Sequence, residues 1–252
     1  MSQIIARERD QCVEIVIQNP RYYNCLTRQM WGQLEAIARD VSSRQDIRAV
    51  IVRGEGHHFS SGYDLDELGT LSYEEVNQSF ALMERAISAV ESIPVPVIGV
   101  LQGYCLGGAF ELALACDIRL GDSSVRMGMP IARIGIMLSH TFASRLVREL
   151  GLPRSKILLF TGRLLTADQG ERYGLLAEVY PDPSHLEAGV REWVRDIHAQ
   201  FPRALNQAKA SLHEVSLEEV TEPPYFVDST DFFTSVQRFR HARDQNSGTS
   251  GS

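Results

Sequence analysis

Strand-like and helix-like patterns alternate along the first half of this chain, and this alternation limits the possible folds more than any other feature. Three strand-like segments, either alternating or continuously apolar, are residues 12–17, 48–52 and 97–101. Amphipathic helical segments lie between them at residues 30–41 and 73–92. Strands joined by crossover helices form parallel sheets, so we predict an α/β core.

The second half of the chain is predicted to be mainly helical, after two short strands at residues 117–120 and 125–129. Short strands at this point indicate a sheet that turns or stacks on itself. Ser139 can cap the first of several helical segments, and the last amphipathic segment is residues 226–242.

The chain contains no internal repeat and no low-complexity linker, so we expect one domain over residues 1–246. Within this domain, we expect the core to end near residue 195 and C-terminal helices to occupy residues 196–246. Residues 247–252 are only Ser, Gly and Thr, which predicts a disordered tail.

Composition excludes several classes of protein. The net charge is −7 and no long basic run is present, so we predict no nucleic-acid partner. No stretch approaches the roughly 18 apolar residues of a membrane span, and residues 1–10 lack an apolar signal region. We therefore expect no membrane association and, by default, a cytoplasmic location. The cysteines form no C-x-x-C pair and no cluster with histidine, so they are predicted to be small buried residues and not metal ligands: Cys12, Cys25, Cys105 and Cys116.

Two glycine-rich segments, residues 54–65 and 102–111, each follow a predicted strand. The second lacks the G-x-G-x-x-G order of a dinucleotide site and the G-K-[ST] ending of a phosphate-binding loop. Such loops at the ends of neighbouring strands can direct backbone N–H groups at one point, as an oxyanion requires. Glycines before a helix can also serve only to allow a tight turn, and both interpretations stay open at this level.

Four segments carry a more specific pattern. They are N-P followed by N-C-L within residues 19–26, F-S-S-G-Y-D-L at residues 59–65, G-Y-C-L-G-G-A-F-E-L-A-L-A-C-D at residues 103–117, and T-G-R with a following G-L-L-A-E-V within residues 161–179. With these motifs, which span nearly the whole chain, the sequence resembles the enoyl-CoA hydratase/isomerase superfamily, also called the crotonase family.

The resemblance implies a crotonase-like spiral of ββα units followed by a C-terminal helical trimerisation region. It implies a homotrimer or homohexamer. It also implies an acyl-CoA thioester as substrate, with coenzyme A bound as part of that substrate and no further cofactor required.

Carried over to this chain, the family's oxyanion hole corresponds to the backbone N–H groups of Ser60 and Gly108. These groups would stabilise the enolate that forms when charge moves onto the thioester oxygen. The resemblance places the CoA nucleotide near Asn24 and His58. The residues that it places around the substrate are Phe59, Ser61, Gly62, Tyr63, Asp64, Gly107, Pro130 and Ile131.

The resemblance implies that Glu111 transfers a proton, whereas on physical grounds alone a glutamate in the first turn of a helix complements the helix dipole. The hydratases carry a second glutamate in a P-E pair, and the matching pair here is Pro130-Ile131. Ser139 or His140 could replace the lost acid. The simpler interpretations are a serine N-cap and a partly buried histidine.

We therefore predict an enzyme that acts on acyl-CoA, either an enoyl-CoA hydratase/dehydratase or an isomerase with one acid/base glutamate. Because residue 131 cannot transfer a proton, two alternatives stay open. One is an acyl-CoA decarboxylase or thioester hydrolase of the same superfamily, and the other is an acyl-CoA-binding protein without catalytic activity.

Overall fold

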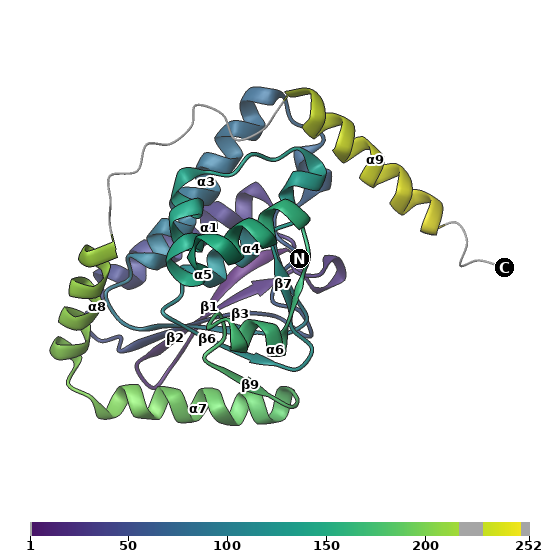
Figure 1. The fold of residues 1–252 in the computed structure, drawn as a ribbon. Helices are drawn as coiled ribbons and strands as arrows, with labels where there is room; N and C mark the ends of the chain where they lie inside the picture. The colour runs from purple at the N-terminus through teal and green to yellow at the C-terminus, as the bar shows by residue number, and fades with distance from the viewer. Residues whose placement is uncertain (1, 217–228, 248–252) are drawn as a thin grey trace.

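The computed structural model describes residues 2–216 and 229–247, and its largest element is a six-stranded sheet (Figure 1). In spatial order the strands are β1 (Gln3–Arg9), β2 (Cys12–Gln18), β3 (Ala49–Gly54), β4 (Val97–Leu101), β6 (Ile118–Asp122) and β9 (Glu178–Tyr180). Strands β1 and β2 are antiparallel, and each later neighbour is parallel to the one before it. The predicted parallel α/β core is confirmed.

A second, three-stranded sheet contains β5 (Tyr104–Leu106), β7 (Arg126–Gly128) and β8 (Leu165–Thr166). The chain passes directly from β4 in the large sheet to β5 in the small one through Gln102 and Gly103. The φ angle of Gly103 is +49°, in the left-handed region that glycine tolerates. This turn produces the second layer that the short strands predict.

Helices cover both faces of the large sheet. On one face lie α1 (Arg28–Ser43), α3 (Tyr73–Glu91), α4 (Gly108–Leu114) and α5 (His140–Thr161). On the other face lies α7 (Pro183–Ala199), which runs along the bottom of Figure 1 and packs Leu186 and Val190 against the sheet. The larger apolar core lies between the sheet and helices α1, α3, α4 and α5. Residues of both glycine-rich segments are part of this core.

Six shorter or peripheral elements complete the structure. They are η1 (Pro20–Tyr22), α2 (Leu65–Leu68), η2 (Ile131–Ile134), α6 (Ala167–Arg172), α8 (Pro202–Ser216) and α9 (Ser229–Ser247). Helix α9 contacts α2 and η2, so the C-terminal helix returns to the region that follows the first glycine-rich loop.

Local sequence signals position the helices as expected. The Thr27 side chain accepts from the N–H of Met30 and begins α1, and the Ser139 side chain accepts from the N–H of Phe142 and begins α5. Gly151 has a φ of 70° and a ψ of 157°, which interrupts α5. The four cysteines are buried and free, as predicted.

One strand was not predicted, and two predicted segments lie partly outside the described residues. Residues 3–9 form the edge strand β1, which was not among the predicted elements. Residues 6–9 of this strand are exposed, so the strand depends on its hydrogen bonds with β2 and not on an apolar face. Of the predicted helix at 226–242, the first three residues lie outside the described part of the chain, as do residues 248–252 of the predicted tail.

Candidate active site

The two glycine-rich loops lie side by side where β3 and β4 end. A parallel bridge pairs Ser60 of the first loop with Cys105 of β5. The Ser60 N–H donates to the Tyr104 carbonyl at 2.9 Å, and the Leu106 N–H donates to the Ser60 carbonyl at 3.1 Å. The first loop therefore runs as a short extended segment beside β5, just before the chain enters α4.

Gly62 allows the two backbones to approach each other. Its φ angle is +94°, and a Cβ atom there would lie 2.6 Å from the Leu106 carbonyl oxygen and 3.3 Å from the Gly108 nitrogen. No side chain fits in this space, because the nearest atoms belong to the backbone. The contact brings Tyr63 next to the start of α4.

Among the residues that the structure describes, the backbone N–H group of Tyr63 has no acceptor, while the N–H groups on either side of it are paired. The Gly62 N–H donates to the Ser60 Oγ at 3.0 Å, and the Asp64 N–H donates to the Leu26 carbonyl at 2.9 Å. Within the described part of the chain the Tyr63 N–H makes no hydrogen bond. A buried residue that leaves its N–H unpaired invites an acceptor from a ligand.

The second loop offers a similar group. The Gly107 N–H donates to the Gly128 carbonyl at 3.0 Å, whereas the Gly108 N–H makes no hydrogen bond to any described residue. Gly108 is the first residue of α4, where the helix cannot supply an acceptor. The expectation that the Ser60 N–H is available is wrong, because it donates to Tyr104. The unpaired pair at this point is Tyr63 and Gly108.

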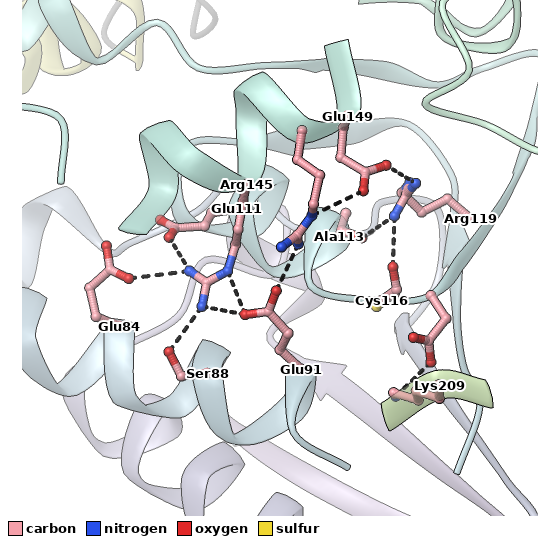
Figure 2. Close-up of polar contacts among 12 residues, drawn as sticks. Glu84, Ser88, Glu91, Glu111, Ala113, Cys116, Arg119, Arg145, Glu149 and Lys209 are labelled. Atoms are coloured by element: carbon pink, nitrogen blue, oxygen red, sulfur yellow. Dashed lines mark hydrogen bonds and ion pairs between the residues drawn. The ribbon is translucent and has the colours of Figure 1, made fainter. Parts of the chain in front are cut away.

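Glu111 lies one turn beyond Gly108 in α4 and is buried, with 2% of its surface exposed. Figure 2 shows its carboxylate beside the Arg145 guanidinium of α5, at 2.7 Å. The same guanidinium contacts two acidic side chains of α3, Glu84 at 3.3 Å and Glu91 at 2.7 Å. It also donates to the Ser88 Oγ at 2.9 Å. Glu111 is therefore one of three carboxyl groups around a single buried cation.

This environment sets the protonation of Glu111. Burial raises its pKa well above the usual value, and the neighbouring Glu84 carboxylate raises it further, whereas Arg145 lowers it. Burial alone would also raise the pKa of Glu91, but Arg145 and Arg148 outweigh it and leave that pKa below its usual value. Glu91 is therefore ionised at neutral pH, while Glu111 favours its protonated form.

The network extends from Arg145 along α5 (Figure 2). Arg148 donates to Glu91 at 2.8 Å, and Glu149 accepts from Arg119 at 2.5 Å. Arg119 also donates to the carbonyls of Cys116 and Leu175, at 2.7 and 2.6 Å. These contacts join α5 to the end of α4 and to β6, so the position of Glu111 is fixed from several sides.

A separate cleft of about 620 Å³ lies beside the first loop. Its lining includes Tyr23, His58, Tyr104 and Arg126. The His58 ring stacks on Tyr104 with centroids 5.0 Å apart, and its Nδ1 accepts from the Tyr104 N–H at 3.1 Å. Burial, followed by the charge of His57, lowers the pKa of His58, so its ring is neutral at pH 7. The cleft is also lined by Asp122 and Asp182, and the Arg126 guanidinium donates to the Val125 carbonyl at 2.7 Å.

Asn24 does not contribute to this cleft, contrary to its expected contact with CoA. Its side chain is fully buried and donates to the carbonyls of Glu55 at 2.8 Å and His58 at 2.7 Å. Its Oδ1 accepts from the Asn19 N–H at 2.9 Å. Both amide hydrogens are thus used, and the residue positions the loop.

Comparison with known proteins identifies the same family as the sequence motifs. The sequence pattern of the enoyl-CoA hydratase/isomerase family matches residues 7–247. The chain belongs to this family. It is 35% identical over 193 residues to the probable enoyl-CoA hydratase EchA17 of Mycobacterium tuberculosis, covering 76% of this chain and 73% of that protein. The family relationship thus extends from the first strand to the last helix.

A second relative, the putative enoyl-CoA hydratase/isomerase YngF of Bacillus subtilis, is 32% identical over 201 residues, covering 79% of this chain and 77% of the relative. Among solved structures, an enoyl-CoA hydratase/carnithine racemase from Magnetospirillum magneticum superposes with a TM-score of 0.82 at 28% identity. That match covers 99% of this chain and 92% of the other. The crotonase-like α/β fold is therefore confirmed.

The position of the family's second glutamate carries no proton donor. Pro130 precedes η2, and Ile131 begins it as a half-buried side chain against the large core. Ser139 is buried and acts as the N-cap of α5, as its simpler interpretation predicts, and it also donates to Glu84. His140 is exposed and not partly buried.

Three other residues that were expected around the substrate make contacts within the protein instead. Phe59 is fully buried in the core, and Asp64 caps α2 by accepting from the Asp66 N–H at 2.9 Å. Ser61 is half-buried, and its N–H donates to the Tyr23 carbonyl at 2.9 Å. These residues hold the loop in shape. Among the described residues no group of side chains could hold a metal ion, and no helix is long and apolar enough to cross a membrane.

Sequence reasoning missed the polar groups that control Glu111 in this family member. Glu84 precedes Glu111 by 27 positions and Arg145 follows it by 34, on two other helices. No spacing rule links residues so far apart. The sequence gives one indication of these contacts. Arg145 lies on the apolar face of an amphipathic helix, and a buried charge requires a partner.

Proposed function

We propose that this protein is an enoyl-CoA hydratase or isomerase in which the N–H groups of Tyr63 and Gly108 bind the thioester oxygen. The observation that supports this best is that these two N–H groups have no acceptor among residues 2–216 and 229–247, at the point where the glycine-rich loops touch. Each donor to a developing oxyanion contributes about 3 kcal/mol in other acyl-transfer sites. Two such donors suit an enolate.

Glu111 is the proposed proton-transfer group. It lies in the same helix as Gly108, one turn away, and its raised pKa keeps it protonated at a pH where an ordinary glutamate is ionised. A protonated carboxyl can deliver a proton to the α-carbon of an enolate. The enolate forms when water adds to the β-carbon or when the γ-carbon loses a proton, and in either case the Glu111 carboxylate accepts the proton that is released. Glu111 then passes this proton to the α-carbon, which gives hydration or a double-bond shift, respectively.

The CoA nucleotide is proposed to bind beside His58 and Tyr104. His57 and His58 of the first loop line this cleft, and the same loop carries Tyr63. Coenzyme A then enters as part of the substrate, and the reaction needs no separate cofactor.

Copies of the chain are proposed to assemble as a trimer or hexamer. Several large apolar side chains are exposed near the end of α5 and the start of α8, including Phe160 at 80%, Ile157 at 61% and Phe201 at 84%. Such a surface is typical of one that is covered in an assembly. Light scattering on the purified chain tests this, and a monomer at micromolar concentration would contradict it.

A second reaction class is favoured by one observation, the isoleucine at residue 131. Decarboxylation of a malonyl-type CoA also gives an enolate, and thioester hydrolysis gives a tetrahedral oxyanion. Both need the oxyanion donors but not a second carboxylate.

One experiment separates these possibilities. The wild type, Glu111→Gln and the control Glu74→Gln are assayed with 2-enoyl-CoA, 3-enoyl-CoA, malonyl-type CoA and saturated acyl-CoA, measuring loss of the double bond, CO2 and free thiol. We expect turnover of enoyl-CoA that falls about a hundredfold or more in Glu111→Gln alone, with CoA-ester binding retained. Release of CO2 or thiol supports the second class, and tight binding without any turnover indicates a binding protein.

A further inference from the structure

Three buried polar groups have no hydrogen-bond partner among residues 2–216 and 229–247. They are the Trp31 Nε1–H, the Tyr63 hydroxyl and the Ser79 hydroxyl. Trp31 and Ser79 are fully buried, and Tyr63 is 7% exposed. Buried polar groups in native proteins are rarely left without a partner, so these three require an explanation.

The three side chains form one cluster, although they come from α1, the first loop and α3. The centroids of the Trp31 and Tyr63 rings lie 6.1 Å apart, and the Tyr63 ring lies 5.6 Å from the Phe80 ring. Ser79 precedes Phe80 in α3, and its hydroxyl lies near enough to Tyr63 to oppose the rise that burial causes in the pKa of Tyr63. The cluster therefore joins three parts of the chain.

The two hydroxyl groups of the cluster cannot satisfy all of its donors. Their contact lacks the geometry of a hydrogen bond. A bond between Tyr63 and Ser79 would use one hydroxyl hydrogen and leave the other unused. It would also leave the Trp31 N–H, which can only donate. The cluster thus offers at least two donors to an oxygen acceptor.

The cluster lies beside the start of α4. A Cβ atom on Gly108 would lie 3.3 Å from the Trp31 Cζ2 and 2.6 Å from the Met83 Sδ. Met83 follows Ser79 by one turn, so both lie on the same face of α3. The side chain of Met83 is unbranched and flexible, so it can move to admit part of a ligand between α3 and α4.

We propose that this cluster recognises a neutral oxygen, as a hydroxyl, keto or ether group, on the acyl chain of the substrate beyond its β-carbon. The inference rests on the proposed function, because binding of the thioester oxygen by Tyr63 and Gly108 brings the acyl chain next to the cluster. A plain alkyl chain would bury the three polar groups against carbon, whereas an oxygen accepts their hydrogen bonds. Sites built to hydrogen-bond a substrate oxygen discriminate strongly against analogues that lack it.

The charges around Tyr63 favour a neutral oxygen over a carboxylate. Burial raises the pKa of the Tyr63 hydroxyl most, and the Ser79 hydroxyl opposes this rise. The carboxylates of Glu67 and Asp64 raise the pKa further, and Arg28 lowers it. The Tyr63 hydroxyl is therefore uncharged at neutral pH and can donate. A carboxylate on the substrate would be buried near the two acidic side chains, which is unfavourable.

Binding measurements test the proposal without requiring turnover. Calorimetry compares alkyl and ω-hydroxyalkyl CoA esters of equal length, from butanoyl to octanoyl, with the dicarboxylic esters as the charged alternative. At one length or more, we expect the hydroxy ester to bind about tenfold more tightly than the alkyl ester. Ser79→Ala and Tyr63→Phe should remove most of this preference. Ser42→Ala and Tyr173→Phe, which make the same changes at half-buried positions outside the cluster, should retain it.

The Trp31 indole allows the proposed hydrogen bond to be observed directly. The chain has two tryptophans, and the Trp193 Nε1–H already donates to Glu178 at 3.1 Å. In a proton–nitrogen correlation spectrum, the hydroxy ester should move the Trp31 indole signal further downfield than the alkyl ester does. The Trp193 signal should not differ between the two esters, and Trp193→Phe assigns the signals.

Three results would overturn the proposal. They are equal affinity for hydroxy and alkyl esters at every length, tighter binding of a dicarboxylic ester than of the hydroxy ester, and a Trp31 signal that is the same with both esters. If the wild type prefers the hydroxy ester but turns over no CoA ester, the proposed function fails and the recognition of oxygen stands. Turnover of enoyl-CoA without this preference has the opposite meaning.

Discussion

The Glu111 carboxylate lies 2.7 Å from the Arg145 guanidinium, and each of these side chains is only 2% exposed. The pair joins α4 to α5, and the N–H of the first residue of α4 has no acceptor in the described part of the chain. A proton-transfer group held by a buried cation is restricted in position, which suits catalysis. The same arrangement makes the pair important for folding.

Replacing Arg145 with methionine should destabilise the protein by about 3–5 kcal/mol, because three carboxyl groups then lose their shared cation. Urea unfolding measures the change, and Arg191→Met, at an exposed position of α7, is the matched control. Arg145 lowers the pKa of both Glu91 and Glu111, so without this cation their folded-state pKa values rise. The loss of stability should therefore be largest at alkaline pH and shrink as the pH falls. A loss that does not depend on pH would contradict this account.

The raised pKa of Glu111 predicts how the wild type responds to pH. Burial favours the neutral acid, so its contribution to stability is fully present below the unfolded-state pKa and is lost as the pH rises through the folded-state value. Glu111→Gln cannot ionise. The melting temperature of Glu111→Gln should thus fall less than that of the wild type between neutral and alkaline pH. Parallel melting curves for the two proteins would show that Glu111 is already ionised at neutral pH.

Gly62 should be more sensitive to substitution than Gly56 of the same loop. Both have positive φ angles, +94° and +76°, but a Cβ at Gly62 would lie 2.6 Å from the Leu106 carbonyl, whereas at Gly56 no atom lies within 4 Å. Gly62→Ala should force the loops apart and lower kcat about a hundredfold or more.

Gly56→Ala is the control, because it carries only the cost of a left-handed alanine, about 1 kcal/mol of stability. Steady-state kinetics with thermal melting distinguishes the two effects. Equal kinetics in the two variants would show that the close approach at Gly62 does not matter for the reaction.

The sequence predicts those structural features that depend on residues close together along the chain. Caps at Thr27 and Ser139, the break at Gly151 and the strand–glycine–helix order before Glu111 all follow from local patterns, and all are present. The identity of the free N–H groups does not follow. In an extended segment successive N–H groups point to opposite sides, so only the pairing of Ser60 with Cys105 shows that Tyr63, and not Ser60, remains unpaired.

The same limit applies to the acid/base groups. Ile131 indicates that a carboxylate is missing, but nothing in the linear sequence relates Glu84 to Glu111. Their proximity depends on how α3 packs against α4, which is a tertiary contact between helices separated by the two strands β4 and β5.

Gly108 allows the oxyanion proposal to be tested at a single backbone atom. Gly108→Pro removes its N–H, and proline is tolerated at the first position of a helix, where the N–H has no helical partner. Gly108→Ala keeps the N–H and adds a Cβ that meets the flexible Met83 Sδ at 2.6 Å and Trp31 Cζ2 at 3.3 Å. The alanine variant therefore controls for crowding.

Loss of one oxyanion donor should lower kcat about 10²- to 10³-fold in the proline variant relative to the alanine variant, with little change in CoA-ester affinity. Single-turnover kinetics and calorimetric binding of a saturated acyl-CoA measure the two quantities separately. If the two variants turn over substrate at the same rate, the Gly108 N–H does not bind the thioester oxygen. A matching loss of affinity would instead indicate that it binds substrate and transition state equally, which gives no gain in kcat.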